Sequence, residues 1–324
     1  MFQYQIMESI LSNFSSPVVL AFVLGIASKF VKSDLEFPRP LYQSISIYLL
    51  LAIGLKGGVE LSKTTFSVFL LPATATLALG IITPLTAFVI IRYIRKLDMS
   101  NSAGLAAHYG SVSMVTFLVA ISFMEDKGMQ PEGYMPTLLA LLEIPGIIVA
   151  LMIPIAVSKN VASLGKALHE VVTGSSIFLL IGGVIIGYIA GPEKFGPVEP
   201  FFVNGFQGAL FLFLLELGMT TASRFRDLKK VGAFIILFGV FVPILHAVLA
   251  IFFGYWAGLS TAGITVLATM TSSASYIAAP AAVRIALPKA SPSIYLTASL
   301  GITFPFNITL GIPLYYYLTV LITG

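Results

Sequence analysis

The sequence predicts an all-α membrane protein with ten transmembrane helices, arranged as two inverted repeats of five helices each. Three observations support this fold class: the composition, an internal duplication and the distribution of charge. Hydrophobic residues make up 57% of the 324 residues, charged residues make up 10%, and the mean hydropathy is +0.98. Because soluble domains contain about 25% charged residues, this chain cannot cover itself with a water-facing surface. We therefore expect many membrane spans.

The same composition excludes several classes of function. The pI is 9.1, but eighteen Lys and Arg spread over the chain form no dense basic patch, so we expect no nucleic-acid partner. The absence of Cys excludes disulfides, thiol catalysis and Cys-ligated metals. The three histidines, His108, His169 and His246, are too far apart in the sequence to suggest a metal site.

Ten apolar stretches are long enough to cross a bilayer, which requires about 20 helical residues. They lie at 16–32, 42–62, 66–93, 101–124, 134–158, 172–191, 200–222, 231–256, 259–284 and 293–322.

Four short motifs occur twice, in the same order. The pairs are Leu50-Leu51-x-x-Gly54 with Leu214-Leu215-x-x-Gly218, Gly80-Ile-Ile-Thr-Pro84 with Gly239-Val-Phe-Val-Pro243, Ser111-Val-Ser113 with Ser273-Ala-Ser275, and Glu143-Ile-Pro145 with Thr303-Phe-Pro305. Their offsets of 164, 159, 162 and 160 are close to half of the chain length. In an apolar chain such a duplication is typical of transporters. We predict a first repeat over 1–158, a linker over 159–171 and a second repeat over 172–324.

The Lys and Arg residues predict how the chain is oriented. Loops after odd-numbered spans hold fourteen of them, whereas loops after even-numbered spans hold only Lys63, Lys127 and Lys194. The fourteen are Lys29, Lys32, Arg39, Arg92, Arg95, Lys96, Lys159, Lys166, Arg224, Arg226, Lys229, Lys230, Arg284 and Lys289. By the positive-inside rule the linker is cytoplasmic and both termini are outside. We expect the protein in the cell inner (plasma) membrane.

An odd number of spans per repeat makes the second copy enter the membrane from the opposite side. Inverted repeats of this kind give related inward-open and outward-open conformations, which is the structural basis of alternating access. Channels and scaffolds also contain duplications, so topology alone leaves these classes open.

The fourth and ninth spans carry the candidate anion site. Both place small hydroxyl residues at mid-membrane depth, with Gly or Pro nearby: Gly110, Ser111 and Ser113 in one, and Ser272, Ser273 and Ser275 in the other. Ser favours helix caps over helix interiors, and irregular backbone at this depth is tolerated where it lines a cavity. We predict two broken helices whose half-helix N-termini, each with about half a positive charge, bind an anion. The alternative is close helix packing through small residues.

Glu143 is the candidate cation ligand, because an ionisable group this deep in a span is costly and by default functional. Together with Thr116, Thr303 and Asn307 it would supply the hard oxygen ligands that sodium needs. The alternative is a protonated Glu143 that is hydrogen-bonded between helices.

Three other charged groups in the spans have weaker interpretations. Lys56 and Glu60 are four residues apart and either pair on one helix face or extend to the interface. The sequence suggests no partner for Glu216.

An enzyme is not expected. His108 lies near Ser111 and Ser113, but Gly110-Ser-Val-Ser113-Met lacks the second glycine of a nucleophile elbow. The serine pair also recurs in the ninth span without a histidine, and catalysis does not require two symmetric copies.

These residues resemble the sodium-dependent bicarbonate transporters, the SbtA-type permeases, over essentially the whole chain. The motifs that carry the resemblance are Gly54-Leu-Lys-Gly-Gly58, Gly110-Ser-Val-Ser113, Glu143-Ile-Pro145, Ser272-Ser-Ala-Ser-Tyr-Ile-Ala-Ala-Pro280 with Arg284, Pro288-x-Ala-Ser-Pro292-Ser-x-Tyr295 and Gly311-Ile-Pro313-Leu. The resemblance implies a core domain that moves like an elevator against a gate domain, a homotrimer, and sodium-driven bicarbonate uptake. It also implies an anion site between the two breaks.

Two departures from the cyanobacterial members are visible. Tyr276 stands where those members have an Asp in the ninth-span break, which bears on sodium stoichiometry and on the substrate. The long cytoplasmic insertion between the repeats is absent, which weakens the implied PII-like regulatory partner.

The sequence therefore predicts a sodium symporter for a small monovalent anion, bicarbonate first. One alternative is a sodium-coupled carrier of another small organic anion, which would need a larger pocket. The alternative from a different class is a non-transporting membrane sensor or scaffold.

Overall fold

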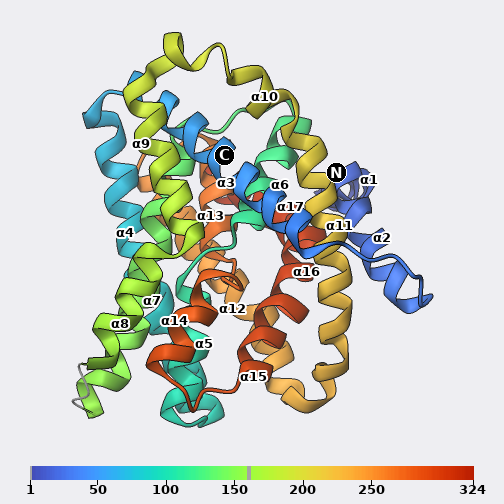
Figure 1. Ribbon diagram of the computed structural model, residues 1–324, viewed down its shortest axis with the longest axis vertical. Helices are drawn as coiled ribbons and strands as arrows, with labels where there is room; N and C mark the ends of the chain where they lie inside the picture. The colour runs from blue at the N-terminus through green and yellow to red at the C-terminus, as the bar shows by residue number, and fades with distance from the viewer. Residues whose placement is uncertain (1, 159–161) are drawn as a thin grey trace.

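The computed structural model describes residues 2–158 and 162–324, and nearly all of them are helical (Figure 1). The helices of the first half are α1 (Phe2–Ser15), α2 (Pro17–Phe30), α3 (Arg39–Lys63), α4 (Phe66–Val89), the π-helical turn η1 (Ile90–Arg95), α5 (Met99–Gly110), α6 (Met114–Asp126) and α7 (Met135–Ser158). Those of the second half are α8 (Ala162–Thr173), α9 (Ser175–Phe195), α10 (Glu199–Asn204), α11 (Phe206–Arg224), the 3-10 turn η2 (Phe225–Asp227), α12 (Leu228–Trp256), α13 (Thr261–Thr271), α14 (Ala278–Ala286), α15 (Pro292–Leu296), the π-helical η3 (Thr297–Thr303), α16 (Phe304–Phe306), the π-helical η4 (Asn307–Gly311) and α17 (Ile312–Thr323). The prediction of an all-α protein is confirmed for the described residues.

Eight helical segments of the described chain are long and apolar enough to cross a membrane, compared with the ten predicted spans. The other two predictions, 16–32 and 259–284, correspond to shorter helices. Helix α2 has 14 residues, which at 1.5 Å per residue is about 21 Å, short of the roughly 30 Å hydrocarbon core. The second stretch is divided into α13 and α14 by an unwound segment.

Two helices occur where the sequence predicted no span. Helix α1 precedes α2, and a bend at Ser16 before Pro17 separates them. Helix α8 covers most of the predicted linker and packs against α14 and α7. Residues 159–161 of that linker lie outside the described residues.

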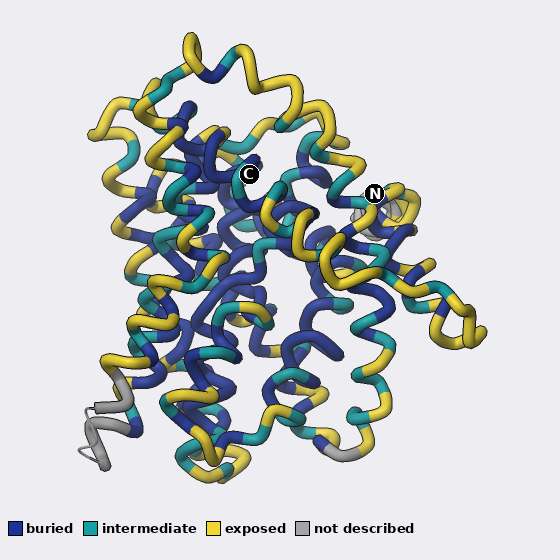
Figure 2. The backbone as a smooth tube through the Cα atoms, viewed as in Figure 1, coloured by how far each residue is buried: buried dark blue, intermediate teal, exposed yellow. Residues whose placement is uncertain are grey.

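The helices form two groups. Helices α2, α3, α9 and α11 pack chiefly on one another, α3 with α9 and α2 with α11, and we call them the paired-helix layer. The segments α4–α7 and α12–α17, which we call the broken-helix bundle, pack through contacts of α4 with α5 and α7, and of α12 with α13 and η3. Figure 2 shows the buried residues in the middle of the molecule, with exposed residues on the outer faces of the peripheral helices.

Glycines set the close approach within the paired-helix layer. Gly54 of α3 lies against Gly183 and the Leu180 carbonyl of α9, and Gly25 of α2 lies against Gly218 and the Leu215 carbonyl of α11. A methyl group at either Gly25 or Gly54 would overlap the facing backbone. Small residues allow such approach between helices in a membrane, where packing rather than hydrophobicity holds helices together.

The last predicted span is interrupted twice by π-helical turns, η3 and η4. Asn13 of α1 is 3% exposed and donates from Nδ2 to the carbonyls of Ile308 (2.8 Å) and Thr309 (2.9 Å) in η4. Because a buried carbonyl is costly to leave without a donor, α1 contributes to the stability of this irregular turn.

Candidate functional site

The first break lies in the fourth predicted span. Helix α5 ends at Gly110, Ser111 and Ser113 are extended, and α6 begins at Met114. Ser113 caps α6, because its Oγ accepts a hydrogen bond from the Thr116 amide at 3.2 Å. Gly110 is packed closely: a Cβ there would lie 2.6 Å from Pro84 Cβ and 3.0 Å from the Gly146 carbonyl oxygen. Here α5 meets α4 and α7.

The second break lies in the ninth predicted span, between α13 and α14. Ser272 and Ser273 end α13 by donating from Oγ to the carbonyls of Thr269 (3.0 Å) and Met270 (2.6 Å). Ser275 acts at the next half-helix, where its Oγ accepts from the Ala279 amide at 3.2 Å. Each hydroxyl therefore accepts an amide hydrogen in the first turn of the half-helix that follows its break, but Ser113 is the N-cap of α6, whereas Ser275 lies two residues before Ile277, the N-cap of α14.

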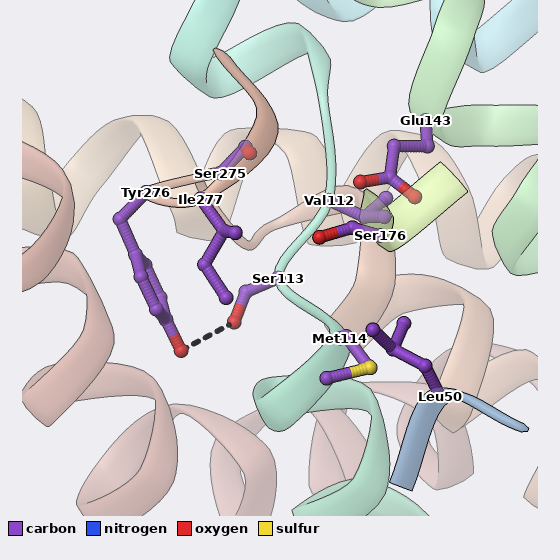
Figure 3. Close-up of a pocket in the computed structure, with 9 residues that line it drawn as sticks. All are labelled: Leu50, Val112, Ser113, Met114, Glu143, Ser176, Ser275, Tyr276 and Ile277. Atoms are coloured by element: carbon purple, nitrogen blue, oxygen red, sulfur yellow. Dashed lines mark hydrogen bonds between the residues drawn. The ribbon is translucent and has the colours of Figure 1, made fainter. Parts of the chain in front are cut away.

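The two breaks are joined by hydrogen bonds. The Ser113 amide donates to Ser273 Oγ at 2.7 Å, and the Ser275 amide donates to the His108 carbonyl at 2.8 Å. Ser113 Oγ also donates to Tyr276 Oη at 3.2 Å, which is the dashed line in Figure 3. All three serines are buried. The sequence-predicted Ser113, Ser273 and Ser275 are thus brought together at one crossing point.

A cavity of about 20 Å³ adjoins this crossing point and is large enough for about one water molecule. Its lining comes from the breaks, from α7 and from the paired-helix layer, as Figure 3 shows. The lining residues are Leu50, Val112, Ser113, Met114, Glu143, Ser176, Ser275, Tyr276 and Ile277.

Glu143 brings the carboxylate to this cavity. It lies on α7 and is 8% exposed, and within the described residues no hydrogen bond or ion pair satisfies its carboxylate. The alternative of a Glu143 that is hydrogen-bonded between helices is therefore not what the described residues show. A buried carboxylate without a partner is unfavourable, and the role of Glu143 as a cation ligand stays a prediction.

The other three predicted cation ligands occupy different surroundings. Thr116 is fully buried, and its Oγ1 has no hydrogen-bond partner among the described residues. Thr303 Oγ1 donates to the Gly239 carbonyl at 2.7 Å and lies 2.6 Å from Tyr109 Oη. Asn307 donates from Nδ2 to the Ser272 carbonyl at 3.0 Å and accepts at Oδ1 from Tyr315 Oη at 2.7 Å. No common contact gathers the four side chains around one point, and their role as ligands stays a prediction.

Ser111 and His108 each present a buried polar atom to the region of the breaks. Among the described residues, Ser111 Oγ and His108 Nε2 have no hydrogen-bond partner. The His108 ring stacks on Tyr295 with centroids 4.4 Å apart, and its Nδ1 lies 2.7 Å from the Gly104 carbonyl. Its packing is thus that of a structural histidine whose main-chain carbonyl supports the second break.

A second cavity of about 420 Å³ lies between α3, α6 and the chain that precedes α7, and we call it the vestibule. Ile53 and Phe117 line the vestibule. Ile53 lies three residues after Leu50, and Phe117 lies three residues after Met114, and both Leu50 and Met114 line the smaller cavity. About one helical turn of apolar side chains therefore separates the vestibule from the breaks.

The vestibule also gives partners to two charged groups that the sequence left open. Lys56 Nζ lies 4.0 Å from Glu125 on α6, and Glu60 pairs with Lys63 at 2.7 Å. The first of the two alternatives, a pair between Lys56 and Glu60, is therefore not what the structure shows, since Lys56 faces Glu125 and Glu60 is paired with Lys63. Glu216 also has a partner, since it accepts at Oε1 from Thr220 Oγ1 at 2.8 Å.

The two half-helices that lead into the breaks start with different caps. Asp98 caps α5 and accepts from the Asn101 amide at 3.0 Å, whereas Ser260 caps α13 and accepts from the Gly263 amide at 3.1 Å. Partial burial acts to raise the pKa of Asp98, but the hydrogen bonds from Asn101 and the local backbone outweigh it, and the net pKa is lowered from 3.8.

Sequence reasoning missed several residues of the site. Leu50 and Ser176 reach the cavity from helices that carry no repeated polar motif, and only the three-dimensional packing reveals them. Tyr276 was named from the sequence as a departure from the cyanobacterial members, but not as a residue that lines the cavity. No sequence signal pointed to Asn13, because its hydrogen-bond partners lie 295 and 296 residues away in the chain.

A family model for the Na+-dependent bicarbonate transporter superfamily matches residues 17–320. No curated protein sequence matches this chain. The match covers nearly the whole chain and confirms the resemblance that the motifs predicted. The chain belongs to the Na+-dependent bicarbonate transporter superfamily, and it is a membrane transporter.

Proposed function

We propose that this member of the superfamily is a secondary active transporter that carries bicarbonate together with sodium. The single observation that carries the proposal is the crossing of the two breaks beside a buried carboxylate. The hydroxyls of Ser113 and Ser275 each accept an amide hydrogen in the first turn of a half-helix, at the cavity that Glu143 lines. Such helix N-termini favour an anion, and the carboxylate favours a cation.

Mutual neutralisation of the two ions would provide the coupling. A lone anion between α6 and α14 would lie beside the Glu143 carboxylate, and a lone sodium ion would lie near two helix N-termini. Each ion therefore lowers the cost of burying the other. Because coupling between two binding sites is reciprocal, sodium would raise the affinity for bicarbonate by the factor by which bicarbonate raises the affinity for sodium.

The anion would be held by Ser111, Ser113, Ser273 and Ser275 and by the amides of the two breaks, with Gly110 and Ser272 shaping the backbone. The sodium ligands would be Glu143, Thr116, Thr303 and Asn307. Glu143 and Thr116 fit this role as they stand, because neither side chain oxygen has a partner among the described residues. Thr303 and Asn307 would have to exchange existing hydrogen bonds for the ion.

The contacts of the paired-helix layer support the inverted repeat. If the span that contains α2 corresponds to α9, and α3 to α11, then the α3–α9 pair corresponds to the α11–α2 pair. The glycine contacts follow the same exchange, since Gly54 with Gly183 corresponds to Gly218 with Gly25. This swap is what a pseudo-two-fold axis in the membrane plane would produce.

On this basis the paired-helix layer is the gate and the broken-helix bundle is the moving core of an elevator-like transporter. The cavity of about 20 Å³ is too small for the four heavy atoms of bicarbonate, so the bundle must move away from Leu50 and Ser176 to admit it. The vestibule, about one turn away, would be the outer access route.

A sodium-coupled carrier for a larger organic anion is the second candidate. A larger carboxylate would require a wider separation of the same side chains than bicarbonate does. A non-transporting sensor or scaffold is not favoured by the family.

The protein would lie in the plasma membrane as a homotrimer with both termini outside. A PII-like regulator has no support beyond the resemblance. The orientation can be tested with a membrane-impermeant maleimide, because the natural chain has no Cys. A single Cys at exposed Ser15 should be labelled on intact cells, and one at exposed Ser33 should not.

Transport is tested by uptake of labelled bicarbonate into proteoliposomes with an inward sodium gradient or an equal potassium gradient. Sodium should accelerate uptake, and unlabelled bicarbonate should compete better than acetate at equal concentration. Uptake that ignores sodium would exclude symport, and stronger competition by acetate would favour the second candidate.

A further inference from the structure

A cavity of about 550 Å³ lies where α2 ends, beside the end of α11 and the turn η2. Three cationic residues line it: Lys29 of α2, Arg226 of η2 and Lys229 of α12. Two aromatic residues, Phe30 and Phe225, complete its sides, with ring centroids 6.3 Å apart. This basic cavity shares no lining residue with the cavity at the breaks.

The cavity has an excess of positive charge. No carboxylate lines it, and within the described residues no ion pair within 4.0 Å is formed by Lys29, Arg226 or Lys229. Lys29 donates only a long hydrogen bond, 3.4 Å, to the Leu35 carbonyl, and it attracts Glu216 at longer range. Nearby, Arg224 Nε is buried without a hydrogen-bond partner among the described residues. Several unmatched cations around one cavity favour an anionic ligand.

An exposed apolar stripe on α2 leads directly to this cavity. Leu20, Val23 and Leu24 are 49%, 40% and 55% exposed, and Phe30 at the rim of the cavity is 68% exposed. Val23 and Leu24 lie three and four residues after Leu20, and Phe30 lies seven residues after Val23, so all four lie on one side of the helix. Figure 1 shows α2 at the edge of the molecule, away from the centre of the bundle. An apolar chain can therefore lie along α2 with its polar end at the cations.

We propose that the basic cavity binds the phosphate headgroup of an anionic phospholipid, with an acyl chain along the exposed stripe of α2. A soluble anion would account for the cations but not for the stripe, and a neutral lipid would account for the stripe but not for the cations. Arginine and lysine at the end of a membrane helix favour phosphate headgroups of the adjoining leaflet.

The position of the cavity gives the lipid a consequence for transport. The turn η2 is the link between α11 of the paired-helix layer and α12 of the broken-helix bundle. Arg224, at the end of α11, packs on Gly301 of η3. A Cβ added to Gly301 would lie 3.3 Å from the Cβ of Arg224. A headgroup held by Lys29, Arg226 and Lys229 would join α2 to this link and hold the layer in place while the bundle moves.

Binding can be measured by tryptophan quenching, because the chain has one tryptophan, Trp256. The reporter is Phe30→Trp in a Trp256→Phe background, reconstituted with brominated phosphatidylglycerol or brominated phosphatidylcholine. The test variant adds Lys29→Gln, Arg226→Gln and Lys229→Gln. The matched control adds Arg95→Gln, Lys96→Gln and Lys289→Gln, three exposed cations outside the cavity.

We expect brominated phosphatidylglycerol to quench the reporter preferentially, and the preference to fall by about fivefold for each cavity cation removed. The control triple should keep the preference. Equal quenching by both lipids would overturn the assignment. Loss of the preference on adding inorganic phosphate would assign the cavity to a soluble anion instead, and quenching by neither lipid would mean that another copy of the chain covers the stripe. These outcomes do not depend on whether the protein transports bicarbonate.

Discussion

Helix α7 and the α15–α17 segment hold corresponding positions in the two halves of the sequence, yet their polar groups are arranged differently. Helix α7 continues through Pro145, and its Glu143 carboxylate has no partner among the described residues. The α15–α17 segment is interrupted by η3 and η4, and its Thr303 and Asn307 are hydrogen-bonded to neighbouring elements. The breaks themselves are alike, because at each break a serine hydroxyl, of Ser113 or Ser275, accepts an amide hydrogen in the first turn of the following half-helix. The shared features suit an anion, and the feature that differs suits a cation.

The difference at Glu143 gives the largest expected effect. Glu143→Gln keeps the size of the side chain and removes its charge, so sodium should no longer accelerate bicarbonate uptake, a loss of about tenfold or more. The measurement is the ratio of uptake with and without a sodium gradient. Glu216→Gln is the matched control, because Glu216 already accepts a hydrogen bond from Thr220. Wild-type sodium dependence in Glu143→Gln would return Glu143 to a structural role.

Because the two breaks are alike, we expect that removing a serine hydroxyl from either break will change the KM for bicarbonate by a similar factor. Ser113→Ala and Ser275→Ala each remove a hydroxyl at the cavity that accepts an amide hydrogen of a half-helix, so each should raise the KM for bicarbonate by roughly fivefold to tenfold. Ser299→Ala is the control, since its buried hydroxyl is bonded only within its own segment. A large effect from one serine and none from the other would show that the anion contacts a single break.

The irregular turns of the α15–α17 segment predict a dependence on α1 that α7 does not have. Asn13→Leu removes the donor to two buried carbonyls of η4, which should lower the free energy of unfolding by about 2 kcal/mol. Thermal unfolding in detergent measures the loss. The same variant should raise the KM for sodium, because η4 carries Asn307. Unchanged stability would mean that another group satisfies the carbonyls.

The smallest expected effect is on the pH dependence of stability, and it comes from the different N-caps of α5 and α13. The pKa of Asp98 is lowered by its hydrogen bonds, so its charged form stabilises α5 above the ordinary pKa of 3.8. That contribution is lost as the pH falls through the lowered folded value. Asp98→Asn should therefore have a flatter thermal unfolding profile than the wild type between about pH 6 and pH 3, whereas Ser260→Ala should shift the profile without changing its slope. Identical slopes for Asp98→Asn and the wild type would show that this cap does not affect stability.

The sequence was sufficient for the features that depend on local chemistry. Serines beside Gly110 and before Pro280 predicted both breaks, and apolar length predicted most of the spans. It was insufficient where tertiary contacts decide. Helix α2 is shorter than the apolar stretch that predicted it, because Pro17 starts a new helix and the chain leaves the helix after Phe30. The π-helical turn η4 accepts two hydrogen bonds from Asn13, at the other end of the chain, and no local pattern could reveal that contact.

The candidate site shows the same division. Ser113, Ser273 and Ser275 could be predicted because their pattern occurs twice, and Glu143 because a carboxylate in a span is unusual. Leu50 and Ser176 could not be predicted from the sequence, since only the packing of α3 and α9 against the breaks brings them to the cavity. Thr303 and Asn307 were chosen by correspondence with Glu143, and in the described residues both already have hydrogen-bond partners.

The most direct test of coupling is the reciprocal flux. Proteoliposomes that contain the wild-type protein are given an inward bicarbonate gradient, and the uptake of radioactive sodium is measured against a chloride gradient of equal size. The account predicts that bicarbonate accelerates sodium uptake in the wild type and not in Glu143→Gln. Sodium uptake at the same rate with either anion in the wild type would contradict it.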